Sequence, residues 1–328
     1  MYENIKNIPY INMPVTGGSR HVFILPFYNQ NEWKTWVVDY KKRNDENNLI
    51  GLDGTSLIRG EYIAEYQADD KDCYVDFVDN LYRYFVYHNT EHSIKMLVEY
   101  CKNIGACLCK INCIYKSSDN EFVIDSGSYV WTEIESLMIF ARSIFDYMQD
   151  ILSTILVSVR WDDGHKSKNL PKAFSKMVFH NDNLLTADEL EEKYKLYRPI
   201  VDCYIKHSNF FMYLRNFRNK IVHSFCEPQI VFYTDRGFCV DPTKEPFNSF
   251  NWHESMYYNS NLVSLIPWIT WIIENVYVAC NDFTNIMIKS IAMKPIYTDK
   301  YRVFNRSFIA NGIADIARVA KGEFFENI

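Results

Sequence analysis

A long apolar stripe over residues 132–159 constrains the fold more than any other feature of the chain. Apolar side chains recur there every three or four positions, which is the spacing that places them on one face of an α-helix. The stripe consists of Ile134, Leu137, Met138, Ala141, Phe145, Met148, Leu152 and Ile155. Several long amphipathic helices follow one another in this half of the chain, and packing them as a bundle buries their apolar faces.

The residues that follow predict the partners of this helix. TADELEEKYKLYRPIVDCYIKH begins at Thr186 and has Glu189 three positions later, which is the pattern of a helix-capping box. Pro199 is expected to kink or split this helix. A polar loop is expected over 160–185 and a long apolar helix over 260–292. Between the helices, QIVFYTDRGFCV predicts a small β-hairpin that turns at TDRG.

Residues 1–128 have a mixed α+β character. RHVFILPFY (20–28) predicts a strand, and the stretch 31–48 predicts a short helix that runs into a polar loop. A further helix is predicted over 76–105. The alternation of apolar residues and cysteines in ACLCKINCIYK predicts one strand of a hairpin, with EFVIDS as the other strand.

DSGS, residues 125–128, is expected to end the N-terminal region. The chain would then have three parts: a mixed α+β region over 1–128, a helical bundle over 129–295 and a C-terminal tail over 296–328 with one short helix. The fold class expected from this pattern is mainly α.

Charge and cysteine content limit the classes of function. The net charge is −6, from 35 Lys and Arg against 41 Asp and Glu, so any contact with nucleic acid would be a local basic patch. Nine cysteines and no recognisable secretory leader favour reduced thiols in the cytoplasm. The apolar run 262–280 contains Pro267 and Glu274, so we expect a buried helix and no membrane partner.

LRNFRNKIVHSF, residues 214–225, divides into an apolar face and a polar face when it is read as a helix. The expected core side chains are Phe210, Leu214, Phe217, Ile221 and Phe225. On another face Arg215, Asn219 and His223 recur every four residues, and Arg218 lies beside them. Arginine suits phosphate and histidine moves protons near neutral pH, so this set can act on a phosphodiester. The same residues also suit an ordinary solvated helix surface.

RNKIVH resembles the R-x(4–6)-H signature of the HEPN superfamily, with Arg218, Asn219 and His223 at the positions of its R-N-x-x-x-H form. The resemblance covers about residues 130–295 and implies a small helical bundle. Many prokaryotic HEPN proteins are metal-independent ribonucleases of toxin–antitoxin, abortive-infection and CRISPR-linked defence systems. The resemblance therefore implies an endoribonuclease that needs no cofactor and builds its site at a homodimer interface.

The family mechanism assigns a role to each residue of the motif. His223 would be the general acid and base for the ribose 2′-hydroxyl and the leaving oxygen, and Arg218 would stabilise the charge on the phosphorus centre. Asn219 would orient the phosphate or the histidine. Arg215 and Lys220 would contact the RNA backbone. A cognate antitoxin or regulatory protein would be a further partner.

Glu135, Arg142 and Asp146 resemble the E-x(6)-R-x(3)-D pattern that is common in the early HEPN helix. Their spacing places them in one narrow stripe opposite the apolar stripe of the helix. They would form either a network that orients Arg218 or His223, or an exposed stripe of salt bridges.

HNTEH, residues 88–92, offers a different chemistry, because it fits the H-x-x-E-H pattern of inverted zinc peptidases. His88 and His92 would bind zinc and Glu91 would be the general base. The alternative is a polar helix start with Asn89 or Thr90 as its cap.

Two further alternatives remain open. Cys107, Cys109 and Cys113 would share one face of the predicted strand, as buried thiols or as part of a metal site. Many HEPN-like bundles also serve as non-catalytic binding or dimerising modules, and the sequence is compatible with that role.

Overall fold

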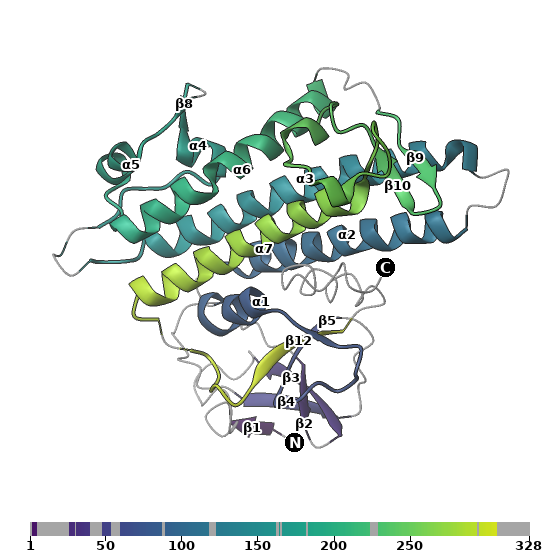
Figure 1. Cartoon of the computed structure of the whole chain (residues 1–328). Helices are drawn as coiled ribbons and strands as arrows, with labels where there is room; N and C mark the ends of the chain where they lie inside the picture. Colours follow the sequence, from purple (N-terminus) through teal and green to yellow (C-terminus); the bar gives the residue numbers. More distant parts are fainter. Residues whose placement is uncertain are drawn as a thin grey trace.

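The computed structural model describes residues 2–4, 26–29, 31–39, 48–53, 60–86, 89–117, 123–161, 164, 166–181, 183–223, 229–293 and 295–306. A layer of long helices lies over a β-sheet, and the short helix α1 (Asp76–Asn80) lies between the two layers (Figure 1). The described part of the chain is mainly α with small sheets, as the sequence predicts.

Four long helices form the helical layer: α2 (Glu91–Lys116), α3 (Val123–Leu156), α6 (Arg198–His223) and α7 (Leu265–Ser290). All eight residues of the predicted apolar stripe in α3 are buried. Aromatic rings join the helices: Phe145 of α3 contacts Phe210 of α6 at 6.0 Å between ring centroids, and Phe210 contacts Trp271 of α7 at 5.4 Å. The two predicted helices over 132–159 and 260–292 are therefore confirmed.

The capping box predicted at Thr186 is present at the start of α5 (Ala187–Tyr194). The Thr186 hydroxyl accepts from the Glu189 amide at 3.3 Å, and the Glu189 carboxylate accepts from the Thr186 amide at 2.8 Å. Lys195 ends α5 with a left-handed φ of 55°, and Pro199 lies in the first turn of α6. The kink or split predicted at Pro199 is a split: the segment forms two separate helices, α5 and α6.

The predicted hairpin is present as β9 (Phe232–Thr234) and β10 (Gly237–Val240), which turn at TDRG. Gly237 has a φ of 107°, a conformation that side chains with a Cβ rarely adopt. β11 (Val263–Ser264) adds a third strand. The polar stretch before α5 contains α4 (Phe174–Val178), β7 (Phe179–His180) and β8 (Asn183–Leu184).

The larger sheet has seven strands in the order β1-β4-β3-β2-β5-β12-β6. They are β1 (Tyr2–Asn4), β2 (Phe27–Asn29), β3 (Glu32–Asp39), β4 (Asn48–Asp53), β5 (Gly60–Ala64), β6 (Cys73–Tyr74) and β12 (Arg302–Arg306). Only β2 and β5 pair in parallel among the described strand pairs. Ile63 and Val303 belong to the main core beneath the helices, whereas Tyr62 and Phe304 stack in a separate aromatic cluster.

The structure corrects the first helix predicted for the N-terminal region. The short helix expected at the start of 31–48 is instead strand β3 (Glu32–Asp39), which pairs with β2 on one side and β4 on the other, and residues 40–47 of the expected polar loop lie outside the described residues. Its Trp- and Val-rich sequence suits a strand, and pairing on both sides satisfies its backbone. Of the strand predicted over 20–28, Phe27 and Tyr28 belong to β2, and residues 20–25 lie outside the described residues.

The strand and hairpin predicted from ACLCKINCIYK are wrong, because α2 continues to Lys116. Ile104, Cys107 and Ile111 are buried at helical spacing, whereas Cys113 is exposed. In the helix the alternating residues divide between two faces: Cys107 and Ile111, four positions apart, are buried, whereas Cys113 lies on the exposed side, and α2 packs along α3. The helix predicted over 76–105 is interrupted: α1 passes into a π-helical turn (Leu81–Phe85), and α2 begins only at Glu91.

The predicted ends of the bundle also differ from the structure. DSGS and the last residues of EFVIDS lie inside α3, so the expected boundary at 128 falls within a helix. The described part of the expected tail contains strand β12, which joins the sheet of the N-terminal region between β5 and β6. No described helix is both long enough and apolar enough to cross a membrane.

Candidate functional site

The last turns of α6 present the candidate site because an apolar face fixes the helix in the bundle. Leu214 and Phe217 are buried, and Phe217 meets Trp131 of α3 edge-on at 6.1 Å between ring centroids. Ile221 packs partly against the same core. Of the predicted core face, Phe225 lies outside the described residues.

Arg218 and Asn219 are neighbours in space as well as in sequence. Arg218 Nη1 donates to Asn219 Oδ1 at 3.5 Å, and both side chains are partly exposed. The backbone of α6 extends to His223, so the helix carries the whole motif. The side chain of His223 lies outside the described residues.

Behind Arg218, α3 supplies an ion pair between Arg142 and Asp146. Arg142 Nη1 lies 2.7 Å from Asp146 Oδ2, and the Phe174 amide donates to Asp146 Oδ1 at 3.1 Å. Burial raises the pKa of the Asp146 carboxyl above its ordinary value, although Arg142, the Phe174 amide and Arg218 act in the opposite direction. Arg218 is therefore one of the positive charges that act on Asp146 across the contact between α3 and α6.

Glu135, the third residue of the predicted stripe, has a different partner. It accepts from Trp131 Nε1 at 2.9 Å, one turn earlier in α3. Arg142 and Asp146 therefore lie near the motif of α6, whereas Glu135 is engaged with the aromatic contact between α3 and α6.

The two predicted helper cations also have partners within the chain. The guanidinium of Arg215 lies over the ring of Phe179 at 5.3 Å. Lys220 forms an ion pair with Glu245, in the segment that precedes the 3-10 turn Phe247–Ser249. Lys220 would have to exchange this carboxylate for phosphate in order to contact RNA.

The structure adds residues that the sequence did not point to. Asn219 lines a hollow together with Glu245, Asn248 and Ser249, which come from the segment after the hairpin. No local pattern in the sequence marks these residues, because they reach α6 only through the path of the chain after the hairpin.

The residues of the zinc alternative are only partly described. Glu91 is the first residue of α2 and His92 is exposed, while His88 lies outside the described residues. Thr90 occupies the N-cap position, but its hydroxyl donates to the Phe85 carbonyl at 2.5 Å and does not cap α2. Across the described part of the chain, no group of three His, Cys, Asp or Glu side chains is arranged to hold a metal ion.

Cys107, Cys109 and Cys113, the three cysteines of the predicted strand, lie in different environments on α2. Cys107 is buried, Cys109 is partly exposed and Cys113 is exposed. Burial raises the pKa of the Cys107 thiol to about 12, which disfavours the thiolate that a metal binds. The shared strand face on which a metal site would depend does not exist, because these residues are helical.

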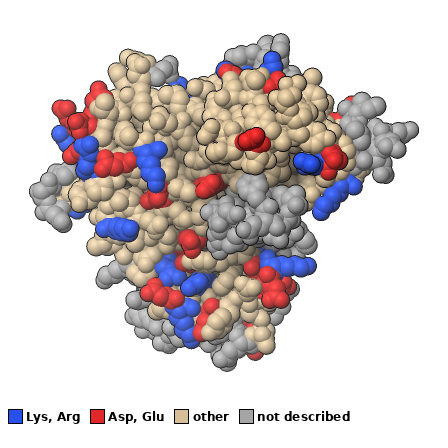
Figure 2. All heavy atoms as spheres, viewed as in Figure 1, with Lys and Arg blue, Asp and Glu red and all other residues tan. Residues whose placement is uncertain are grey.

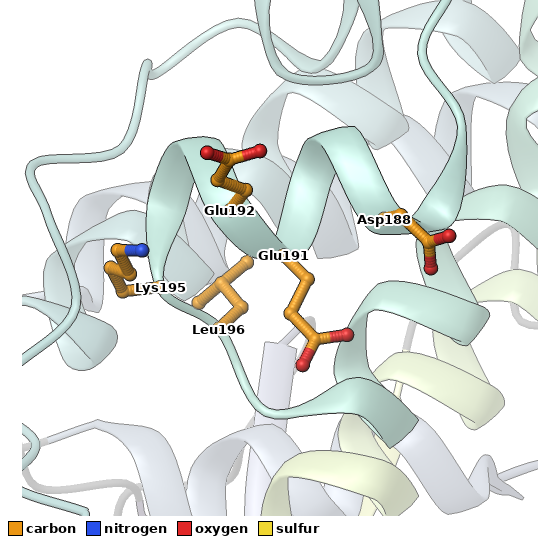
Figure 3. A pocket seen from close by; sticks show the side chains of 5 residues that line it. All are labelled: Asp188, Glu191, Glu192, Lys195 and Leu196. Carbon is orange, nitrogen blue, oxygen red and sulfur yellow. The ribbon is translucent and has the colours of Figure 1, made fainter.

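A second hollow lies on α5, the helix that precedes α6 in the chain. Asp188, Glu191 and Glu192 line it together with Lys195 and Leu196, and Glu192 points away from the other two carboxylates (Figure 3). Arg198 neutralises Asp188 at 2.6 Å and Glu191 at 3.3 Å. This acidic hollow suits neither RNA nor a metal ion held by converging carboxylates.

Surface charge gives no extended basic tract on the face seen in Figure 2, where acidic and basic side chains are interspersed. No family model, curated protein or solved structure matches the chain.

Proposed function

We propose that the chain is a metal-independent endoribonuclease of HEPN type, with Arg218, Asn219 and His223 as its catalytic residues. The observation that carries the proposal is the pairing of the partly exposed Arg218 and Asn219 on α6, one turn before His223. A guanidinium beside an amide can hold a phosphodiester, and a histidine on the next turn can move a proton.

In the proposed reaction the ribose 2′-oxygen attacks the adjacent phosphorus, and the bond to the 5′-oxygen breaks. His223 takes the proton of the 2′-hydroxyl and returns a proton to the leaving 5′-oxygen, with the second copy of the motif completing the acid–base pair. Arg218 stabilises the negative charge of the phosphorus centre. The products are a 2′,3′-cyclic phosphate and a 5′-hydroxyl, so DNA is not a substrate.

Asp146 has a supporting role in this proposal. Its carboxylate holds Arg142 at 2.7 Å and lies within the electrostatic reach of Arg218. An anion at this position limits the directions that the Arg218 guanidinium can adopt. The proposed biological setting is a toxin or an antiviral, abortive-infection effector that a cognate antitoxin or regulatory protein controls.

The test is cleavage of total RNA by the purified chain, with and without EDTA. Cleavage is expected to persist in EDTA, to fall about 100- to 1,000-fold in Arg218→Ala and to fall about 100- to 10,000-fold in His223→Ala. Arg160→Ala and His92→Ala are the matched controls, because both residues are exposed and lie on other parts of the chain. Specific activity is also expected to drop when the protein is diluted until the dimer dissociates.

Other outcomes favour the alternatives. Activity that EDTA abolishes and that His92→Ala also removes would support the zinc site and contradict the ribonuclease. A stable dimer that cleaves no RNA in any condition would support a non-catalytic binding or dimerising module.

A further inference from the structure

We infer that the hollow beside Asn219 holds one nucleobase of the RNA next to the phosphate that is cleaved, and so gives the enzyme a base preference. The inference rests on the proposed ribonuclease function. Polar and aromatic side chains line the hollow: Tyr213, Asn216, Phe217, Asn219, Asn248 and Ser249. Its volume is about 370 Å³, which lies at the lower end of the range of about 300 to 1,000 Å³ for small-molecule sites.

The position of the hollow connects it to the motif. Asn219 lines the hollow and also accepts from Arg218. A group bound in the hollow can therefore contact Asn219, whose side chain also contacts the guanidinium that would hold the phosphate. In an RNA chain the base on the reacting ribose is likewise close to the phosphate that is cleaved, so the base and the phosphate can occupy the hollow and the guanidinium site together.

The walls of the hollow are fixed by hydrogen bonds, so the site exists before a ligand binds. The Tyr213 hydroxyl donates to the Pro246 carbonyl at 2.8 Å and accepts from Trp268 Nε1 at 2.9 Å. The ring of Phe247 is buried and meets Trp268 at 5.0 Å between centroids. These contacts fasten the segment 245–249 to α6 and α7, and a preformed site loses little entropy on binding.

The charge of the lining favours a base over a phosphate. Lys220 is the only cation among the lining residues, and it forms an ion pair with Glu245. A phosphate in the hollow would be repelled by the Glu245 carboxylate, and Lys220 is already neutralised by that carboxylate. The ligand that fits is neutral, polar and flat.

The polar groups that line the hollow can form hydrogen bonds with the edge of a nucleobase. Asn216, Asn219 and Asn248 each carry an amide, which has both a donor and an acceptor side. Bases in single-stranded RNA are recognised by such hydrogen bonds on their edges and by stacking on aromatic rings. Tyr213, which is partly exposed, adds an aromatic side chain to the lining of the same hollow.

The experiment measures binding without cleavage. The probes are fluorescently labelled 2′-O-methyl tetranucleotides of A, C, G or U, which lack the attacking hydroxyl. Fluorescence anisotropy gives a dissociation constant for each with the full chain. The wild type is expected to bind its best tetranucleotide at least about tenfold more tightly than its worst, because one well-placed pair of hydrogen bonds discriminates by that much.

Three variants locate the source of the preference. Asn216→Ala combined with Asn248→Ala is expected to bring the ratio of best to worst below about threefold. Asn248→Asp replaces a donor by an acceptor and is expected to change which tetranucleotide binds best. Asn112→Ala removes an exposed asparagine from α2 and is expected to leave the ratio unchanged. Thermal unfolding confirms that each variant is folded.

The outcomes separate this inference from the proposed function. Equal binding of all four tetranucleotides overturns the base site, even when the chain cleaves RNA. A preference that the double variant retains, or an equal loss of affinity for every base, also overturns it. A preference that the variants alter, in a chain that cleaves no RNA under any condition, supports the base site and contradicts the ribonuclease.

Discussion

Gly127 lies in α3 where the helix passes the backbone of Val231. A Cβ atom added to Gly127 would lie 2.3 Å from the Val231 carbonyl oxygen, far inside van der Waals contact. In the sequence, DSGS reads as a break because serine and glycine are common in turns. In the structure the glycine is helical, and its lack of a side chain allows two parts of the backbone to approach closely.

Gly127→Ala is expected to destabilise the fold by about 1 to 3 kcal/mol, because the cost of the clash exceeds the gain in helix propensity of about 1 kcal/mol. Urea unfolding gives this difference. Ser128→Ala is the control, since Ser128 is exposed on the same helix and its loss should change the stability by less than about 0.5 kcal/mol. A Gly127→Ala variant that is more stable than the wild type would contradict the close approach.

At the scale of elements, a buried histidine joins α6 to α7. His207 Nε2 lies 2.8 Å from Asp282 Oδ2, and Lys206 donates to the same oxygen at 2.6 Å. Burial lowers the pKa of His207 below 6.5, although Asp282 acts in the opposite direction. Burial also opposes ionisation of Asp282, but its hydrogen bonds from Lys206 and His207 outweigh this and lower its pKa.

The folded chain is therefore expected to lose stability as the pH falls below about 6.5, because the unfolded chain then binds a proton at His207 that the folded chain does not. The slope from this residue is at most about 1.4 kcal/mol per pH unit and ends at the lowered folded pKa. His207→Gln keeps a donor for Asp282 and should flatten the slope just below pH 6.5, as measured by urea unfolding at several pH values.

His180→Gln is the matched control, because His180 is exposed, and its slope should equal that of the wild type. A second loss of stability is expected below about pH 3.8, where the unfolded chain protonates Asp282 first. An unchanged slope in His207→Gln would show that another group controls the acid sensitivity.

Sequence patterns predicted the elements whose signal is local. The stripe of α3, the capping box at Thr186 and the turn at TDRG each follow from residues close together in the chain. The sequence predicts a helix where β3 forms and a strand where the last turns of α2 form, and both predictions are wrong. In α2 the alternation of Cys107, Cys109 and Cys113 suggests a strand, but the helix instead buries Cys107 and Ile111, which are four positions apart. Contacts with β2 and β4, and with α3, decide these cases.

The candidate site also contains residues that a local pattern predicts and residues that it does not. Arg218, Asn219 and His223 belong to one helix and are visible as a spaced motif, and Arg142 and Asp146 share another helix face. Asn248 and Ser249 could not be predicted, because a hairpin and a turn bring them to α6 from a different part of the chain. Only the tertiary path of the chain creates the hollow.

On the scale of the whole molecule, Asp79 of α1 ties the C-terminal strand to the rest of the fold. Its Oδ1 accepts from the Tyr297 hydroxyl and from the Val303 amide, both at 2.8 Å. Its Oδ2 lies 2.9 Å from Arg83 Nη2, and Arg83 and Asp79 are both buried. One carboxylate thus satisfies groups from the π-helical turn, from the segment before β12 and from β12 itself.

Asp79→Ala is expected to cost about 3 to 5 kcal/mol, because the buried Tyr297 hydroxyl and Val303 amide lose their carboxylate acceptor and Arg83 keeps only Asp299 as a partner among the described carboxylates. Guanidinium unfolding measures the loss, and hydrogen exchange should show that the Val303 amide loses its protection. Asp76→Ala is the control, since Asp76 is exposed in the same helix, and a change under about 1 kcal/mol is expected. An equal loss of unfolding free energy in the two variants would contradict the role of Asp79 in holding β12.

The place of β12 between β5 and β6 also fixes an order of events during protein synthesis. β5 ends at Ala64 and β6 begins at Cys73, yet the strand that joins them starts at Arg302. At about 5 to 20 residues per second, the ribosome needs roughly ten seconds or longer to make the intervening chain. The edges of β5 and β6 stay without their shared neighbour for that time, so the helical layer can form before the sheet is closed.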